Sequence, residues 1–207
     1  MSARTILTLA NGRGIDLLAP RPQDVDFDAY AEHLAKEKRY NGATPGLEYS
    51  VAEHLSRGTD AILDATGDRI LAAHFHLHDA PEGVLKDQTT PLKEAIAEMI
   101  AARCGILAPQ ILSCFAELED LHQRAIYASA RMPWPSIETH AQVKHWDVVM
   151  FVTEWRDLMQ GVEHPNWGPY AHVAPLPERI RPWDWQTAKR AWLRRAQELL
   201  PALKVSA

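Results

Sequence analysis

Apolar residues recur at steps of three and four along most of the chain from about residue 24 onward. The pattern is clear where Phe27, Tyr30, Ala31 and Leu34 would share one face of a helix. Stretches that contain proline and glycine divide this pattern into segments. Because each amphipathic helix must bury its apolar stripe against a neighbour, the sequence predicts an all-α fold built as a helical bundle.

Capping residues and prolines predict where the helices begin and end. Asp24 or Asp26 can cap the first helix, and Asp184 can cap the last. Thr90-Pro91 is expected to supply an N-cap and a first helical position. Pro81 disfavours a continuing helix, so residues 80–90 are expected to form a turn or loop. The predicted helices run to about Lys38 and then over about 48–65, 68–79, 90–102, 108–129, 137–160 and 184–200.

Two regions depart from the helical pattern. Residues 5–18 read as a small N-terminal β-hairpin, because two short apolar runs flank Asn11-Gly12, a dipeptide that tolerates the positive φ angles of tight turns. Residues 161–183 combine proline, glycine, histidine and tryptophan without a period, and we expect an ordered but irregular lid. The length of 207 residues fits one domain over residues 1–207, with a core at about 24–160 and a C-terminal extension over 161–207.

Charge and cysteine content restrict the class of protein. A net charge of -5 does not favour binding to polymeric nucleic acid. Cys104 and Cys114 are too few for a disulfide framework, and we interpret them as core thiols of a cytoplasmic protein. The apolar run at residues 6–10 is too short for a signal peptide, and no run approaches the ~20 apolar residues of a membrane span.

The strongest chemical feature is the adjacent pair His78-Asp79 at the end of a predicted helix. His54 and Asp147 are further candidate ligands, because each lies in an apolar-periodic helix where an inward polar side chain needs a partner. Two imidazoles and two carboxylates suit Mn, Fe, Co, Ni or Zn better than Ca. Spacing alone leaves two alternatives open: solvated surface groups, or a smaller site made by His74 and His78 one helical turn apart. His74 and His76 are otherwise expected to support the ligands or to lie at the surface.

Six ordered segments over roughly residues 5–160 together resemble the HD-domain metal-dependent phosphohydrolases, specifically the YfbR-like 5′-nucleotidase branch. They are Arg39-Tyr40-Asn41-Gly42, Tyr49-Ser50-Val51-Ala52-Glu53-His54, His78-Asp79-Ala80-Pro81-Glu82, Asp87, Thr90-Pro91-Leu92-Lys93, and Asp147 with the following Thr153-Glu154-Trp155-Arg156-Asp157-Leu158. The resemblance implies the HD-domain helical bundle as the fold. It also implies a homodimer that acts on a small nucleotide.

The resemblance implies a role for each matching position. His54, His78, Asp79 and Asp147 match the ligands of one divalent metal ion, which could be Co, Mn, Fe, Ni, Zn or Mg. Glu82 matches the catalytic carboxylate, and Asp87 matches a residue that touches the sugar or the attacking water. Arg39 and Lys93 match positions that face phosphate. Tyr40 stands where YfbR-like proteins have a tryptophan beside the nucleobase, so it keeps an aromatic surface but leaves base preference open.

The expected activity is hydrolysis of a deoxyribonucleoside 5′-monophosphate. The alternatives are a deoxynucleoside triphosphate triphosphohydrolase, a non-catalytic nucleotide- or metal-binding HD module, and a metal site that only joins helices. The residues keep simpler alternatives too. Arg39 and Lys93 can be surface charges, Glu82 can pair locally, and Asp87 can shape a turn. Glu154 and Arg156 are expected to make structural ion pairs.

Overall fold

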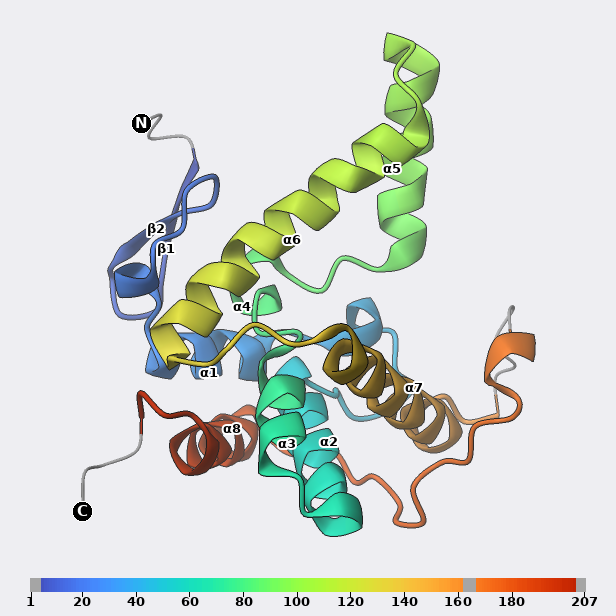
Figure 1. The fold of residues 1–207 in the computed structure, drawn as a ribbon. Coiled ribbons are helices and arrows are strands. Elements are labelled where there is room, and N and C mark those ends of the chain that lie inside the picture. Colours follow the sequence, from blue (N-terminus) through green and yellow to red (C-terminus); the bar gives the residue numbers. More distant parts are fainter. Residues whose placement is uncertain (1–4, 162–166, 204–207) are drawn as a thin grey trace.

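The computed structural model describes residues 5–161 and 167–203 and confirms an all-α fold with a small N-terminal hairpin (Figure 1). The α-helices are α1 (Phe27–Lys36), α2 (Val51–Thr66), α3 (Arg69–Leu77), α4 (Glu82–Leu85), α5 (Thr90–Cys104), α6 (Ala108–Ala130), α7 (Ile137–Leu158) and α8 (Trp185–Leu199). Three short 3-10 turns are η2 (Pro22–Asp24), η3 (Arg39–Gly42) and η4 (Gly168–Tyr170).

The N-terminal hairpin forms where the sequence predicts it. Strand β1 (Ile6–Thr8) pairs antiparallel with β2 (Gly14–Asp16), and Leu7 lies opposite Ile15 in the register. Gly12 in the connecting turn has a φ of 81°, a conformation that glycine adopts without a steric penalty. Ile15 is fully buried, so the hairpin contributes to the main core.

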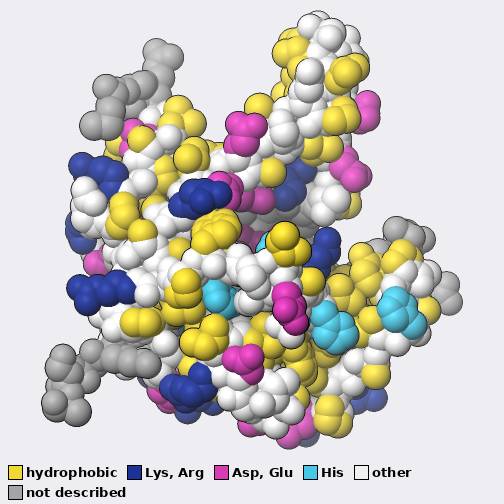
Figure 2. Space-filling model, in the orientation of Figure 1, with side chains coloured by type: hydrophobic (Ala, Val, Ile, Leu, Met, Phe, Trp, Pro, Cys, Tyr) yellow, Lys and Arg dark blue, Asp and Glu magenta, His cyan; other side chains and the backbone are white. Residues whose placement is uncertain are grey.

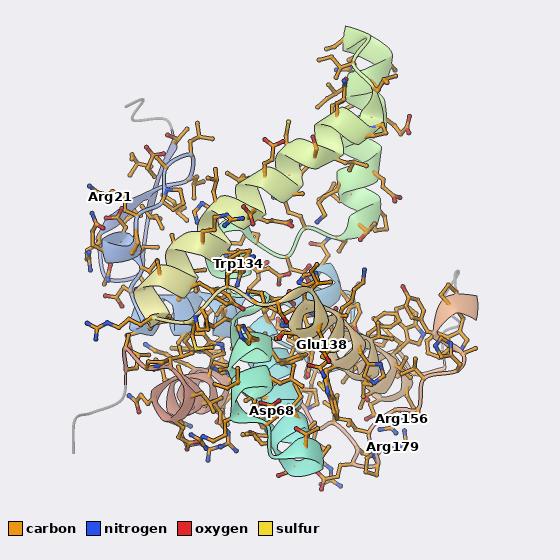
Figure 3. All side chains as sticks on the ribbon, in the orientation of Figure 1. Arg21, Asp68, Trp134, Glu138, Arg156 and Arg179 are labelled. Atoms are coloured by element: carbon orange, nitrogen blue, oxygen red, sulfur yellow. The ribbon has the colours of Figure 1, made fainter. Side chains whose placement is uncertain are left out.

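Side-chain caps start most of the bundle helices. Asp26 and Asp184 accept N–H groups of the first turns of α1 and α8, as expected from the sequence. Ser50, Asp68 and Ser136 do the same for α2, α3 and α7, and Figure 3 labels Asp68 at the start of α3. Each cap satisfies a backbone donor that a helix start leaves unpaired.

Helices α1, α2, α3, α7 and α8 form the bundle. Helix α2 lies against both α3 and α8, α1 packs on α8, and α7 crosses α3 and α2 (Figure 1). Trp192 of α8 is fully buried at the centre of this core. Gly58 of α2 permits a close approach to α3, because a Cβ at this position would overlap the Phe75 ring.

Helices α5 and α6 form a hairpin that projects from the bundle (Figure 1). Helix α5 packs on α6, and Ala97 is its one buried residue. The opposite face of α5 carries Leu92, Ala95, Met99 and Ala102, all exposed, with Leu92 at 48% and Met99 at 49% exposure. Figure 2 shows hydrophobic side chains on the exposed surface of this hairpin.

Three expectations for this part of the chain are wrong. Cys104 and Cys114 are both exposed rather than core residues, because each lies on the projecting hairpin. The expected loop at 80–90 contains the short helix α4, since α3 already ends at Leu77 and Pro81 serves as the N-cap of the next helical turn. Similarly, Thr89 rather than Thr90 is the N-cap of α5.

The C-terminal part follows the expectation of an irregular segment. Residues 167–183 contain η4 and otherwise run without regular structure until α8 begins, whereas residues 162–166 lie outside the described part. Among the helices of the described ranges, none has the length and apolar character needed to cross a bilayer.

Candidate metal centre

The structure brings His54, His78, Asp79 and Asp147 together from three helices. His54 comes from α2, His78 and Asp79 from the end of α3, and Asp147 from α7. One nitrogen or oxygen of each residue lies within 4.8 Å of the others. The four residues predicted as ligands therefore form a group that can hold a metal ion.

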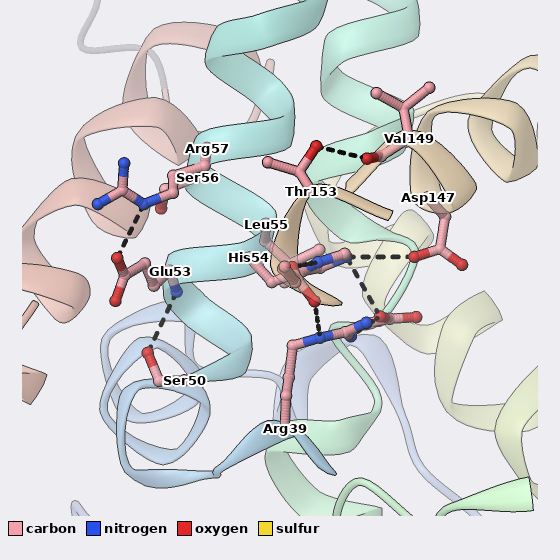
Figure 4. A network of polar contacts seen from close by, with 12 residues as sticks. Arg39, Ser50, Glu53, His54, Leu55, Ser56, Arg57, Asp147, Val149 and Thr153 are labelled. Atoms are coloured by element: carbon pink, nitrogen blue, oxygen red, sulfur yellow. Dashed lines mark hydrogen bonds and ion pairs between the residues drawn. The ribbon is translucent and has the colours of Figure 1, made fainter. Parts of the chain in front are cut away.

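In this group, the Nε2 atoms of the two histidines lie close to the carboxylate oxygens of the two aspartates. Nε2 of His78 lies 3.2 Å from Oδ2 of Asp79 and 3.7 Å from Oδ1 of Asp147. Nε2 of His54 lies 3.4 Å from Oδ1 of Asp147 and 3.8 Å from Oδ2 of Asp79 (Figure 4). Both imidazoles thus direct the same nitrogen toward both carboxylates.

Each imidazole is oriented by its other nitrogen. Nδ1 of His78 lies 2.7 Å from the carbonyl oxygen of Phe75, which also accepts the backbone N–H of His78 at the end of α3. Nδ1 of His54 lies 2.6 Å from Oε1 of Glu154. A carbonyl and an ionised carboxylate only accept hydrogen bonds, so Nδ1 carries a proton in both rings and Nε2 is the nitrogen directed at the carboxylates.

These residues fit a divalent cation. Nε2 of His54 and Nε2 of His78 are buried and have no hydrogen-bond partner among the described residues. A buried polar atom without a partner costs about 1–3 kcal/mol, and a coordinated cation would remove that penalty at both nitrogens. Two imidazoles and two carboxylates are a suitable ligand set for a first-row divalent metal.

The electrostatics of the group also favour positive charge. Burial alone would lower the pKa of His78, but the carboxylates of Asp79 and Asp147 outweigh it and hold that pKa well above its usual value. Burial opposes ionisation of Asp79 and Asp147, yet the neighbouring imidazoles lower the pKa of both carboxyls. The pocket therefore stabilises a cation between two ionised carboxylates.

Glu154 is a residue of this site whose role the sequence analysis missed. The expected ion pair is present, with Arg39 at 3.0 Å, but the fully buried carboxylate also contacts Tyr40 and the ligand His54. Burial raises the pKa of Glu154, and Arg39 with His54 more than compensates, so the pKa lies below its usual value. The spacing in the sequence could have indicated this role. Asp147 and Glu154 are seven residues apart and therefore share one face of α7, so Glu154 lies on the same side as a ligand.

Arg39 and Tyr40 lie beside the group. Nε of Arg39 donates to Glu154 at 3.0 Å, and its Nη1 lies 3.4 Å from Oδ2 of Asp79. The Tyr40 hydroxyl donates to Glu154 at 2.6 Å, and the Tyr40 ring meets Trp155 edge to face at 6.0 Å. The surface-charge alternative for Arg39 does not fit, because its side chain is only 12% exposed.

Glu82 and Asp87 are carboxyls whose ionisation the site disfavours. Burial, together with the charges of Asp79 and Asp87, raises the pKa of Glu82 well above its usual value. Oε2 of Glu82 is buried and has no hydrogen-bond partner in the part of the chain that the structure describes. Burial also raises the pKa of Asp87, although Arg39 opposes the shift. The Asp87 backbone N–H donates to Glu37 at 3.3 Å.

The remaining predicted residues have other contacts. Lys93 pairs with Glu119 on α6 at 3.1 Å, so its role toward phosphate stays a prediction. His74 is buried against the Tyr127 hydroxyl and does not belong to the group, which argues against a site made by His74 and His78. The expectation of a surface position fails for His74 and for His76 alike.

The buried imidazole of His76 has a structural role. Its Nε2 lies 3.0 Å from the Trp192 carbonyl oxygen, which joins α3 to α8. Burial lowers the pKa of His76 to about 3, so the ring is neutral in the folded protein.

Arg156 makes the structural ion pair that was expected of it. Asp157 accepts hydrogen bonds from Arg156 and Arg179, which lie close together in Figure 3, and from the backbone N–H of Ile180. Arg156 also donates to the carbonyl oxygens of Leu176 and Glu178. This network fastens the segment before α8 to the end of α7.

The comparisons with known proteins give no assigned family. No protein-family model matches the sequence. A stretch of 94 residues, 44% of this chain, is 43% identical to an uncharacterized protein of Rhodobacter capsulatus. The match covers 47% of that protein, so the chain spans about half the length of the curated relative it matches.

Proposed function

We propose that this protein is a metal-dependent phosphohydrolase of the HD type that acts on small nucleotides. The observation that carries the proposal is the pair of buried Nε2 atoms of His54 and His78, which have no hydrogen-bond partner in the described ranges and face the carboxylates of Asp79 and Asp147. The sequence resemblance supplies the reaction class, and the site supplies residues suited to it. A deoxyribonucleoside 5′-monophosphate is the proposed substrate.

The metal supplies the Lewis acidity of this chemistry when it is bound, since a divalent cation activates water and polarises a phosphoryl oxygen. Glu82 is proposed to move the proton. A carboxyl with a raised pKa exchanges protons closer to neutral pH than an ordinary one, and Oε2 of Glu82 is free of other partners among the described residues.

Arg39 is proposed to bind the phosphate. Glu154 and Asp79 engage Nε and Nη1 and fix the plane of the guanidinium, which leaves further N–H donors for phosphate oxygens. Tyr40 is proposed to lie beside the base and Asp87 beside the sugar or the attacking water. Lys93 is proposed to add positive charge near the phosphate.

The experiment is phosphate release from a panel of nucleoside mono- and triphosphates, with stripped protein reloaded separately with Mn, Co, Mg and Zn. A phosphatase added to parallel samples detects released triphosphate and so tests the triphosphohydrolase alternative. We expect metal-dependent release from a deoxyribonucleoside monophosphate, which Asp79→Ala abolishes. Glu82→Gln should lose release while retaining metal.

Two outcomes would contradict the proposal. Folded protein that binds metal but releases no phosphate from any nucleotide would support a non-catalytic binding module instead. Release that persists in Asp79→Ala would show that the activity does not depend on this group. Asp120→Ala serves as the control, because it removes an exposed carboxylate on the projecting hairpin.

A further inference from the structure

We infer that Glu154 is a positioning residue whose two carboxylate oxygens hold the ligand His54 and the segment Arg39–Gly42 in one geometry. Oε1 accepts the hydrogen bond from Nδ1 of His54 at 2.6 Å. Oε2 accepts two hydrogen bonds, from Nε of Arg39 at 3.0 Å and from the hydroxyl of Tyr40 at 2.6 Å. One buried side chain therefore joins the metal ligands to the segment proposed to contact substrate.

Helix α7 places Glu154 where it can do this. Asp147 and Glu154 are two turns apart on the same face, so one rigid helix carries both a ligand and the residue that orients another ligand. Glu154 is fully buried, and water does not compete for its oxygens. The three donors come from α2 and from the segment after α1, and their side chains meet at this carboxylate.

The first consequence concerns His54. The hydrogen bond to Oε1 keeps the proton on Nδ1 and fixes the ring plane, so that Nε2 points at Asp147 and Asp79. Partners of this kind typically contribute 10–100-fold to metal affinity. Figure 4 shows that Glu53, the neighbour of His54, points to the other side of α2. There it pairs with Arg57 and accepts the backbone N–H of Trp183.

The second consequence concerns the segment Arg39–Gly42. Tyr40 and Asn41 have φ angles of 56° and 54°, and Gly42 follows with 72°. A left-handed conformation costs about 1 kcal/mol or more at a residue other than glycine, so surrounding contacts must stabilise it. The hydrogen bonds of Arg39 and Tyr40 to Oε2 are such contacts. Without them, we expect this segment to open.

The role toward the metal is independent of the reaction, whereas the effect on nucleotide binding rests on the proposed function. The experiment therefore uses two measurements that need no turnover. Metal affinity is determined by competition of Co²⁺ or Zn²⁺ with a chromogenic chelator, and the visible spectrum of the Co²⁺ protein reports on ligand geometry. Amide hydrogen exchange of residues 39–43 reports on opening of the segment.

Three variants separate the parts of the inference. Glu154→Gln should lower metal affinity about 10–100-fold, alter the Co²⁺ spectrum and accelerate exchange at residues 39–43. Tyr40→Phe removes one donor to Oε2, so it should accelerate exchange there and leave metal affinity within about threefold of wild type. Glu53→Gln removes a second fully buried carboxylate of the same bundle and should change neither measurement.

Specific results would overturn the inference. If folded Glu154→Gln binds Co²⁺ and Zn²⁺ within twofold of wild type, Glu154 does not position His54. If exchange at residues 39–43 is unchanged in both Glu154→Gln and Tyr40→Phe, Glu154 does not hold the segment. Should Glu154→Gln fail to fold, the exchange of Tyr40→Phe still decides the second point. A protein that shows the expected metal and exchange effects but hydrolyses no nucleotide would overturn only the proposed function.

Discussion

The centre of the bundle and the projecting α5–α6 hairpin reverse the usual placement of polar and apolar residues. The centre buries Glu53, His54 and Glu154 completely, whereas the hairpin leaves Leu92 and Met99 about half exposed. Charged residues are rarely buried without partners, and Glu53 and Glu154 both have them. The comparison teaches that the buried side chains of His54 and Glu154 in this core belong to the candidate metal site or support it. It also shows that the apolar face of α5 does not contribute to the core.

The largest expected effect is on metal affinity, and it compares a carboxylate of the candidate metal site with a carboxylate on the hairpin. Asp79→Ala should lower metal affinity by at least about 100-fold, because it removes an anionic ligand and not only a supporting partner. Asp120→Ala, which affects an exposed pair with Arg124, should leave affinity unchanged. Titration with Co²⁺ measures both. Equal affinities in the two variants would mean that the group is not the metal site.

A second prediction concerns how tightly the bundle is packed. Gly58→Ala should lower the free energy of unfolding by about 2–3 kcal/mol, because the added methyl group overlaps Phe75 where α2 meets α3. Gly168→Ala is the matched control, since a Cβ there meets nothing within 4 Å, and its effect should stay within about 0.5 kcal/mol. Denaturant unfolding compares them, and an equal, small effect would show that α2 and α3 can separate at no cost.

A third prediction uses pH. The folded protein keeps His76 neutral down to a pKa of about 3, whereas the unfolded chain protonates it below about pH 6.5. Stability should therefore fall as pH falls from about 6.5 toward 3, and this residue should contribute on the order of 2 kcal/mol between pH 7 and 5. Unfolding of His76→Gln across that range should show a correspondingly smaller pH dependence.

The control for this measurement is His140→Gln, which removes an exposed imidazole and should retain the wild-type pH dependence. If His76→Gln has the wild-type slope as well, the acid sensitivity of the bundle originates elsewhere.

The smallest expected effect is on the hairpin. Met99→Ser should change the free energy of unfolding of the monomer by no more than about 0.5 kcal/mol, because the side chain is 49% exposed. Sedimentation measured beside unfolding tests whether this face is free. A large loss of stability together with a change in the sedimenting mass would show that a second copy covers α5 in the proposed homodimer. The apolar face of α5 would then be buried in the dimer, and the hairpin would no longer differ from the bundle in this respect.

Local sequence predicted much of the architecture. The caps Asp26 and Asp184, the Asn11-Gly12 turn and the helical periods correspond to elements that the structure contains. These features depend on neighbouring residues, so one sequence is sufficient to identify them. The short helix α4 was not predicted, because Pro81 disfavours a continuing helix but fits the start of a new one.

The sequence also identified the four candidate ligands, through the His78-Asp79 pair and the resemblance that orders it with His54 and Asp147. It did not identify the role of Glu154 or the exposure of Cys104 and Cys114.

Taken by itself, the sequence determined the helices, their ends and which residues share a face. Only the tertiary structure decided that residues 54, 78, 147 and 154 meet, and that α5 turns its apolar face outward. The reason is physical. A helical period fixes the direction of a side chain relative to its own helix axis, whereas its neighbours depend on how whole helices pack across long separations in the chain.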